Sequence, residues 1–451
     1  MPNVKAIQQL FEMVDQSVGE LVALHQTLVR CPTVNMGTED SGNEIRVCRI
    51  LQERFVNEAI PSTILESAPS RGNLVAHIGN RTSPRLLLMS HTDVVPIGDE
   101  SAWSVPPFSA EIRDGKIYGR GSDDAKSLVS TGAMTLILLK RAGIPLNGEL
   151  RFLAAADEEA GGKYGIAWLA QNHPDKIRST WAINEGGGTP IQTTKGTAYL
   201  LAVGEKGRME ARFKLVGRGG HAARPWPTDN PLYKLEELIR RIHAYRAELD
   251  LRLPIFENLG EFGITDKATP ETLDSLIERL RDQSLVNELK ALSRLTITPT
   301  ITSAGMKSNV IPAYAELVCD IRTLPHQSEA YVRAELEKII ADIPGTSLEL
   351  HVTAVANASP YPTPFTEALC ESLSLALGGN RIEAVPGLTV GFTDSRWVRL
   401  LGGAVYGFSP LTPDSDTSRP GVHGIDEAME IRNLVLRTKI NIAITLLALD
   451  G

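Results

Sequence analysis

Histidine and carboxylate residues follow three short apolar runs of this sequence, each at the point where the run ends. The runs at 86–89, 150–156 and 181–183 lead into His91-Thr92-Asp93, Asp157-Glu158-Glu159 and Asn184-Glu185, respectively. Short apolar runs that end in polar residues are typical of buried strands. Because ligands of an open α/β sheet bind beyond the carboxyl ends of its strands, the three ends predict one shared site.

The residue types at these ends suit metal binding and proton transfer. A histidine that binds a metal usually donates its other ring N–H to a carboxylate, and Asp93 lies two residues after His91. Adjacent carboxylates repel each other unless a cation or a proton separates them. One carboxylate of residues 157–159 can therefore bind a metal while its neighbour carries a proton. Taken singly, each feature is also compatible with a solvated surface turn.

Glycine-rich turns supply further candidates. Gly119-Arg120-Gly121 precedes Asp123-Asp124, three glycines follow Glu185, and His423 lies in a glycine-containing turn ahead of Glu427. Glycine lets a backbone turn sharply or approach a site closely, but a surface turn explains each of these segments equally well. In combination, two histidines and three to four carboxylates match a zinc site with nitrogen and oxygen ligands better than a surface pattern.

Composition restricts the class of protein. The chain has 451 residues, of which 42% are hydrophobic and 22% charged, as expected for a globular protein with two domains. Its net charge of −8 argues against nucleic-acid binding. No apolar run approaches the roughly 18 residues that cross a membrane, and the N-terminus lacks the apolar core of a signal peptide. The four cysteines form no CxxC pair, so a cytoplasmic location is the simplest expectation.

The order of the patterns predicts an α/β protein with an insertion. Residues 1–196 and 356–451 are expected to form a catalytic domain with a mixed central sheet flanked by helices. The sequence pattern of residues 197–355 differs from that of the catalytic domain. It has period-2 alternation near 200–217, strand-like runs within 296–323, and helical patterns at 232–251 and 329–343. They predict an inserted α+β domain. The proline-rich stretch 357–364 is a plausible return linker, followed by closing helices at 365–377 and 425–447.

These motifs resemble those of the aminoacylase, carboxypeptidase and succinyl-diaminopimelate desuccinylase superfamily of two-zinc exopeptidases and amidohydrolases. The resemblance covers nearly the whole chain and rests on six motifs in order. They are Ser90-His91-Thr92-Asp93-Val94-Val95-Pro96, Trp103 with Pro107-Phe108, Gly119-Arg120-Gly121 with Asp124-x-Lys126, Asp157-Glu158-Glu159, Gly217 with Gly220-His221-Ala222, and His423 with Glu427. Segments 392–399 and 406–410 are most similar to the aminoacylase and yeast-type carboxypeptidase branch.

The resemblance implies a role for each residue of the predicted site. Asp124 bridges two zinc ions, for which cobalt or manganese can substitute. His91 and Glu185 complete one zinc site, and Glu159 and His423 complete the other. Asp93 orients His91, and Glu158 is the general base. The peptide bond between Asp124 and Ala125 is expected to be cis.

The inserted domain resembles a ferredoxin-like lid that also forms a homodimer. The resemblance implies that His221 stabilises the oxyanion at the partner subunit's site, and that Asn309, Arg322 and Gly391 bind the substrate. Two positions depart from the usual pattern, namely Ser127, where glycine is common, and Phe392, where many relatives have a smaller residue. The second departure concerns the size of the substrate, and the segment 252–290 is longer than a minimal lid requires.

The implied activity is hydrolysis of an amide bond in an N-acyl amino acid or small peptide that bears a free carboxylate. A dipeptidase or aminopeptidase of the same superfamily is the alternative enzyme. Glu185 favours the first reading, because relatives with glutamate there tend to be carboxypeptidases and aminoacylases. A ligand-binding protein that keeps the scaffold without catalysis is the non-enzymatic alternative, and metal content together with metal-dependent amidase activity distinguishes it.

Overall fold

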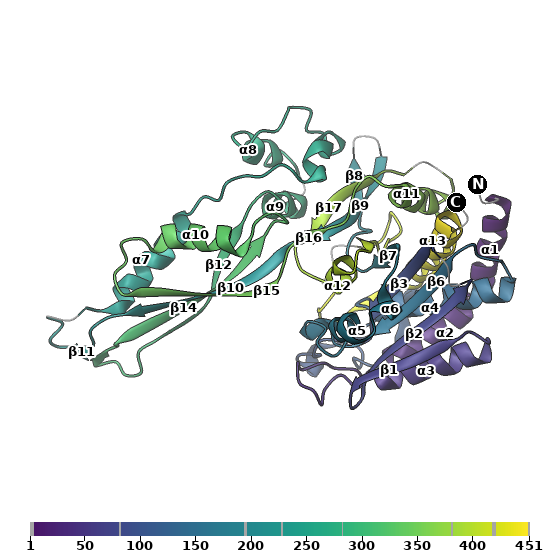
Figure 1. Cartoon of the computed structure of the whole chain (residues 1–451), viewed down its shortest axis with the longest axis horizontal. Helices are drawn as coiled ribbons and strands as arrows, with labels where there is room; N and C mark the ends of the chain where they lie inside the picture. The colour runs from purple at the N-terminus through teal and green to yellow at the C-terminus, as the bar shows by residue number, and fades with distance from the viewer. Residues whose placement is uncertain are drawn as a thin grey trace. The chain divides into compact units, whose positions relative to one another are not determined.

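The computed structural model describes residues 4–80, 83–193, 196–226, 229–281, 283–379, 382–416 and 421–449 (Figure 1). The chain forms two compact units. The first comprises Met1–Val203, Ser359–Gly387 and Thr393–Gly451, and the second comprises Gly204–Ala358 with Leu388–Phe392. Among the described residues, no helix combines the length and apolar character that crossing a bilayer requires.

A mixed sheet forms the centre of the first unit. Its strands lie in the order β1 (Ser62–Ala68), β2 (Arg71–Gly79), β6 (Glu149–Ala155), β3 (Arg85–His91), β7 (Trp181–Asn184), β18 (Ala404–Gly407) and β9 (Gly196–Glu205), while β8 (Pro190–Thr193) and β17 (Ala384–Thr389) pair with β9. The last two residues of β9 belong to the second unit, and there they pair with β16 (Asn357–Ala358). The strands β6, β3, β7 and β18 run parallel to one another, whereas β1 pairs antiparallel with β2, β2 with β6, and β9 with β18. Every residue of β6 is buried, which explains its nearly continuous apolar sequence.

Helices cover both faces of this sheet (Figure 1). Leu88 and Phe152 face α4 at Gly132, whereas their neighbours Leu87 and Leu153 belong to an apolar cluster that includes helices on the other face. The first face is covered by α1 (Val4–Gln16), α2 (Val18–Val29), α3 (Ile45–Asn57), α4 (Lys126–Ala142) and α13 (Ile431–Leu449), with α11 (Pro364–Ala376) packed on α13; the second carries α5 (Ile166–Asn172), α6 (Pro174–Ile177) and α12 (Ser395–Leu400). The predicted α/β class is confirmed.

The second unit contains an antiparallel sheet with one helical face. Its strands lie in the order β12 (Thr296–Ala304), β14 (Tyr314–Thr323), β10 (Gly207–Val216) and β15 (Thr346–Ala354). With α7 (Pro231–Ala244) and α10 (Glu329–Ile340), the chain order is β-α-β-β-α-β, the ferredoxin-like arrangement. Alternate residues of β10, from Met209 to Leu215, pack with both helices in one apolar cluster, as the period-2 pattern predicts.

Short elements complete the two units. They are η1 (Glu100–Ala102), β4 (Glu111–Arg113), β5 (Lys116–Tyr118), η2 (Glu158–Ala160), β11 (Gly220–His221), η3 (Pro254–Phe262), α8 (Leu273–Ile277), α9 (Gln283–Leu292), β13 (Val310–Ile311) and β19 (Ala428–Glu430). The segment 252–290, which is longer than a minimal lid requires, therefore contributes to η3, α8 and α9 between α7 and β12. Its apolar residues Ile255, Leu273 and Leu289 are buried, so it adds core rather than an open loop.

Two predicted helices have wrong ends. The helix expected at 232–251 stops at Ala244, because Tyr245 takes an extended conformation. The closing helix expected at 425–447 begins at Ile431, because Ala428–Glu430 pair with β5 instead. In both places tertiary pairing or backbone geometry overrides a sequence pattern that continues the helical period.

Candidate metal centre

Three strand ends of the first unit meet at one edge of the sheet. His91 is the last residue of β3, and it lies in register with Ala155, the last residue of β6. On the other side of β3, Leu88 pairs with Ile183 of β7, and Glu185 follows that strand directly. Because the three strands are parallel neighbours, their carboxyl ends place the histidine, the acidic turn after β6 and Glu185 side by side.

The carboxylate of Asp124 lies between two histidines. Its Oδ1 is 3.0 Å from Nε2 of His91, and its Oδ2 is 3.1 Å from Nε2 of His423. Each histidine also faces a second carboxylate, since His91 Nε2 is 3.3 Å from Glu185 Oε2 and His423 Nε2 is 3.2 Å from Glu159 Oε2. The arrangement forms two histidine–carboxylate pairs that share one aspartate, which is the geometry a bridging ligand requires.

Glu427 fixes the turn that carries Asp124. This buried carboxylate accepts hydrogen bonds from the backbone N–H groups of Gly121, Asp123 and Asp124, and from Nη1 of Arg120 at 2.7 Å. The carboxylate of Asp123 is oriented differently and lies 3.5 Å from the buried guanidinium of Arg437. The bond between Asp124 and Ala125 is cis, which confirms that prediction.

Asp93 connects the end of β3 to the acidic turn after β6. Its Oδ1 accepts the N–H of Glu158 at 3.1 Å, and its Oδ2 accepts the N–H of Glu159 at 3.2 Å. Nδ1 of His91 lies 3.0 Å from the carbonyl oxygen of Asp93 and 3.5 Å from its Oδ1. One buried carboxylate therefore holds the backbone of both glutamates and also faces the ring of His91.

A buried polar network under this turn was not found by sequence reasoning. Nδ2 of Asn35 donates to Asp93 Oδ2 at 2.8 Å and to Asp157 Oδ1 at 2.9 Å. The fully buried Arg71 donates to Asp157 at 2.8 Å and makes two hydrogen bonds to Glu44. Asp157 has a positive φ of 67°, an uncommon conformation for a non-glycine residue, so its side-chain contacts stabilise the turn. No local pattern marks Asn35 or Arg71, because their partners are distant in sequence.

The site carries an excess of negative charge. Burial alone would lower the pKa of His91, but Glu185, Asp124 and Asp93 outweigh it and raise that pKa well above the ordinary value. Hydrogen bonds to Asp124 and Glu159 raise the pKa of His423 to about 10. Burial raises the pKa of Glu185 to about 7 despite the opposing effect of His91. Such a concentration of carboxylates calls for compensating positive charge.

The residues fit divalent cations. His91, Asp124 and Glu159 offer ligand atoms within 4.8 Å of one another, and so do His91, Glu158 and Glu185. Oε1 of Glu159 is buried without a hydrogen-bond partner among the described residues, as expected for an oxygen reserved for a metal. Imidazole and carboxylate ligands suit zinc, cobalt and manganese.

The remaining candidates lie in the second unit. His221 of β11 is exposed, and its Nδ1 accepts the N–H of Ala223 at 3.1 Å. The carbonyl oxygen of Asn309 accepts the N–H of Ala222, so His221 and Asn309 lie on adjoining segments. Arg322 of β14 donates to Asp320 at 2.7 Å and to the carbonyl of Val390 at 3.4 Å, next to Gly391.

A Cβ atom added at Gly391 would meet only Thr389 Cγ2, at 4.0 Å, among the described residues. The glycine is therefore not required by packing within its own unit. The structure brings the second-unit candidates together in two pairs, His221 with Asn309 and Arg322 with Gly391.

Comparison with known proteins identifies the family. Residues 87–446 match the sequence model of peptidase family M20/M25/M40. The chain belongs to this family. Succinyl-diaminopimelate desuccinylase of Parvibaculum lavamentivorans is 26% identical over 418 residues, covering 91% of this chain and 93% of that protein. Human N-fatty-acyl-amino acid synthase/hydrolase PM20D1 is 27% identical over 449 aligned residues, covering 92% of this chain and 86% of that protein.

A solved M20 structure has the same fold. The metallo-carboxypeptidase of Sulfolobus solfataricus aligns with a TM-score of 0.70 and 18% identity, over 96% of this chain and 100% of that chain. Family membership and a site that fits cations together identify the chain as a metallohydrolase that cleaves amide bonds. The non-enzymatic alternative is therefore set aside.

Proposed function

We propose that this metallohydrolase cleaves the amide bond of an N-acyl amino acid or short peptide that bears a free carboxylate. The observation that supports this proposal most strongly is the position of Asp124. Its two carboxylate oxygens each face a different histidine–carboxylate pair. That arrangement supports two zinc ions, with cobalt or manganese as substitutes, held by His91 and Glu185 on one side of Asp124 and by His423 and Glu159 on the other. When bound, two such cations polarise the substrate carbonyl and acidify a shared water.

Glu158 is the proposed general base. It is adjacent in sequence to Glu159, and the two backbone N–H groups are held by the same Asp93 carboxylate. Glu159 turns toward His423, whereas Glu158 contributes its carboxylate beside His91 and Glu185. In this role Glu158 takes the proton of the attacking water and then transfers it to the leaving nitrogen. Asp93 keeps His91 and Glu158 in their relative positions throughout.

The second unit is the proposed lid, which also forms a homodimer. We infer that His221 donates a hydrogen bond to the oxyanion at the partner subunit's site, and that Asn309, Gly391 and Arg322 position the substrate. Arg322 suits the free carboxylate, because a guanidinium binds a carboxylate with two parallel hydrogen bonds. Nε of Arg322 donates to Asp320, and Nη1 lies 3.4 Å from the Val390 carbonyl oxygen.

The substrate class is supported by the relatives. The Parvibaculum protein is named as a desuccinylase of succinyl-diaminopimelate, and the human protein as a synthase and hydrolase of N-fatty-acyl amino acids. Both names describe an acyl group on an amino acid, which agrees with the glutamate at position 185. The cytoplasmic location expected from the sequence stays a prediction.

Parallel hydrolysis assays test this assignment. The zinc-loaded protein is assayed against N-acyl amino acids, the same compounds with an amidated carboxylate, and dipeptides with a free amine. We expect turnover of the first set, strongly reduced turnover of the second, and little of the third. Preferential cleavage of free-amine dipeptides would favour the dipeptidase or aminopeptidase alternative over an N-acyl amino acid substrate, and equal turnover of the first two sets would refute the requirement for a free carboxylate.

A further inference from the structure

Ser127 occupies a position where glycine is common in the resembling proteins. It lies in the first turn of α4, shortly after Asp124, and its side chain is fully buried. Its Oγ donates to the carbonyl oxygen of Asp123 at 2.6 Å and accepts Nη1 of Arg437 at 2.7 Å. A glycine would provide neither contact, so this departure adds a buried hydroxyl to the turn that carries the proposed bridging ligand.

The hydroxyl of Ser127 holds one end of the peptide unit between Asp123 and Asp124. At the other end of this unit, the N–H of Asp124 donates to Oε1 of Glu427 at 3.0 Å. The carbonyl and the N–H of one peptide are therefore both hydrogen-bonded to buried side chains. Because the peptide plane sets the direction in which the Asp124 side chain leaves the backbone, its rotation would move both carboxylate oxygens relative to the histidines.

Arg437 connects this turn to a second loop of the site. The arginine belongs to α13, which packs on α4, and it is almost fully buried. Besides Nη1, which donates to Ser127, its Nη2 donates to the carbonyl of Ser409 at 3.1 Å and its Nε to that of Pro410 at 3.2 Å. Burial lowers the pKa of the guanidinium, and Asp123, whose Oδ1 lies 3.5 Å away, opposes this. A buried charge is costly unless it is paired and hydrogen-bonded, so these contacts fix the guanidinium in one position.

The loop at Ser409 holds the segment that follows Glu185. Oγ of Ser409 donates to the carbonyl oxygens of Gly186 and Gly187 at 2.8 and 3.1 Å. A Cβ atom at Gly188, where φ is 89°, would lie 2.4 Å from the carbonyl carbon of Ser409, so the close approach of the two segments requires glycine. The position of the Glu185 backbone therefore depends on that of the Ser409 loop.

We propose that Ser127 and Arg437 are positioning residues that hold Asp124 and Glu185 in the relative positions that a shared cation requires. The inference rests on the proposed function, because both carboxylates are ligands of the proposed metal centre. Buried hydrogen bonds run without a break from the peptide before Asp124, through the hydroxyl and the guanidinium, to the loop beside Glu185. A buried charged group is weak evidence for added stability, whereas partners that orient metal ligands typically change metal affinity by about 10–100-fold.

Zinc affinity, measured without substrate, tests the proposal. Competition titrations with a chelator compare the wild type with Ser127→Ala, Arg437→Lys and the double variant. Thr135→Val is the matched control, because it removes a buried hydroxyl of the same helix that donates to the carbonyl of Thr131 at 2.8 Å. The visible absorption of the cobalt-loaded proteins reports the coordination geometry, and urea denaturation of the metal-free proteins reports their stability.

We expect zinc to bind about 10–100-fold more weakly to Ser127→Ala and to Arg437→Lys, with an altered cobalt spectrum, whereas Thr135→Val keeps the wild-type values. Because the guanidinium acts on the turn through the hydroxyl, the double variant should lose less affinity than the product of the two single losses. Ser127→Ala decides the question alone if the arginine variant does not fold.

Equal zinc affinity of Ser127→Ala and the wild type would overturn the inference and leave the proposed function standing. Losses that multiply in full would overturn it as well, because they would show that the two residues act separately. A wild type that binds no zinc would overturn both the inference and the proposed metal centre.

Discussion

The candidate site residues of the two units of this hydrolase differ in burial and in their contacts. In the first unit, His91 and the carboxylates lie buried or half-buried at strand ends and turns, the more exposed His423 lies beside them, and these groups contact one another at 3.0–3.3 Å. In the second unit, strand β10 alternates, with apolar residues against two helices and charged residues such as Arg212 and Lys214 exposed. Its candidates His221 and Asn309 are exposed as well.

This difference indicates a division of labour. Buried carboxylates that face one another are stable only with compensating charge, so the first unit by itself indicates bound cations. The exposed groups of the second unit carry no such signal, and their proposed roles depend on the substrate or on a partner subunit. Variants of the first unit should therefore change metal content or the chemical step, and variants of the second should change turnover or substrate binding alone.

The largest effect is expected from Glu158 in the first unit. Glu158→Ala should lower turnover by about 10²–10⁴-fold while metal content stays near wild type, because it removes a general base and no ligand. Glu159→Ala should instead lose metal from one of the two positions. Kinetics at saturating zinc together with elemental analysis check both. Near-normal turnover of the Glu158 variant would show that the base is another group.

The next effect is expected from His221 in the second unit. His221→Ala should reduce turnover by about 10²–10³-fold, the usual cost of one oxyanion donor, and leave metal content unchanged. A mixed dimer of His221→Ala and Glu158→Ala chains should regain activity at one of its two sites. If mixed dimers form but remain inactive, His221 does not act at the partner subunit's site.

Arg322 should affect substrate binding more than turnover. Arg322→Ala removes charged hydrogen bonds worth about 1.5–3 kcal/mol, which corresponds to a rise in KM of roughly 10–150-fold for carboxylate substrates. Arg212→Ala is the matched control, because it removes an exposed arginine of the same sheet that pairs with Glu210 at 3.3 Å. Equal KM values for the two variants would argue against a carboxylate contact at Arg322.

The smallest effect concerns stability of the first unit. The fully buried ring of His25 lies 3.1 Å from Ser130 Oγ and 3.2 Å from Ser122 Oγ, and burial lowers its pKa to about 3. The unfolded chain therefore binds a proton below pH 6.5 that the folded chain does not, so stability falls as pH falls from 6.5 toward 3.

His25→Asn should remove this contribution. The difference in unfolding free energy between wild type and variant should change by about 1.4 kcal/mol per pH unit below pH 6.5. Urea denaturation at pH 7, 6 and 5 measures it, and acid effects common to both proteins cancel in the difference. Parallel pH curves for the two proteins would contradict a neutral buried His25.

The parts of the fold that could be predicted are those with local signals. Apolar runs that stop at polar residues predicted β3, β6 and β7 and their common edge, and period-2 alternation predicted β10. The helix ends at Ala244 and Ile431 could not be predicted, because they depend on an extended Tyr245 and on pairing of Ala428–Glu430 with β5.

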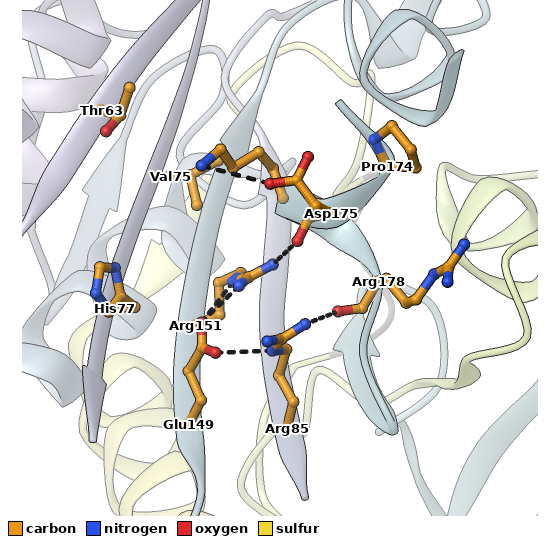
Figure 2. A pocket seen from close by; sticks show the side chains of 10 residues that line it. Thr63, Val75, His77, Arg85, Glu149, Arg151, Pro174, Asp175 and Arg178 are labelled. Atoms are coloured by element: carbon orange, nitrogen blue, oxygen red, sulfur yellow. Dashed lines mark hydrogen bonds and ion pairs between the residues drawn. The ribbon is translucent and has the colours of Figure 1, made fainter. Parts of the chain in front are cut away.

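The hydrogen-bond network around the candidate site could not be predicted from the sequence either. Asn35 contacts Asp93 and Asp157, which are 58 and 122 residues away, and no spacing rule connects positions that far apart. Asp93 was expected to orient His91, but its hydrogen bonds to the backbone of Glu158 and Glu159 follow only from the three-dimensional turn. The buried hydrogen bonds of Glu149 to Arg85 and Arg151 (Figure 2) were hidden for a similar reason, because Arg151 occurs within a run that is otherwise apolar.

Metal content measured by elemental analysis tests the central claim most directly. After loading with zinc and removal of free metal, the wild type should hold two equivalents per chain. His423→Ala should hold about one, and Asp124→Ala should lose both, because the bridging carboxylate contributes to each position. Asp123→Asn, the neighbouring control, should keep two. A wild type that holds no tightly bound metal, or an Asp123 variant that loses metal while the Asp124 variant keeps it, would contradict the proposed centre.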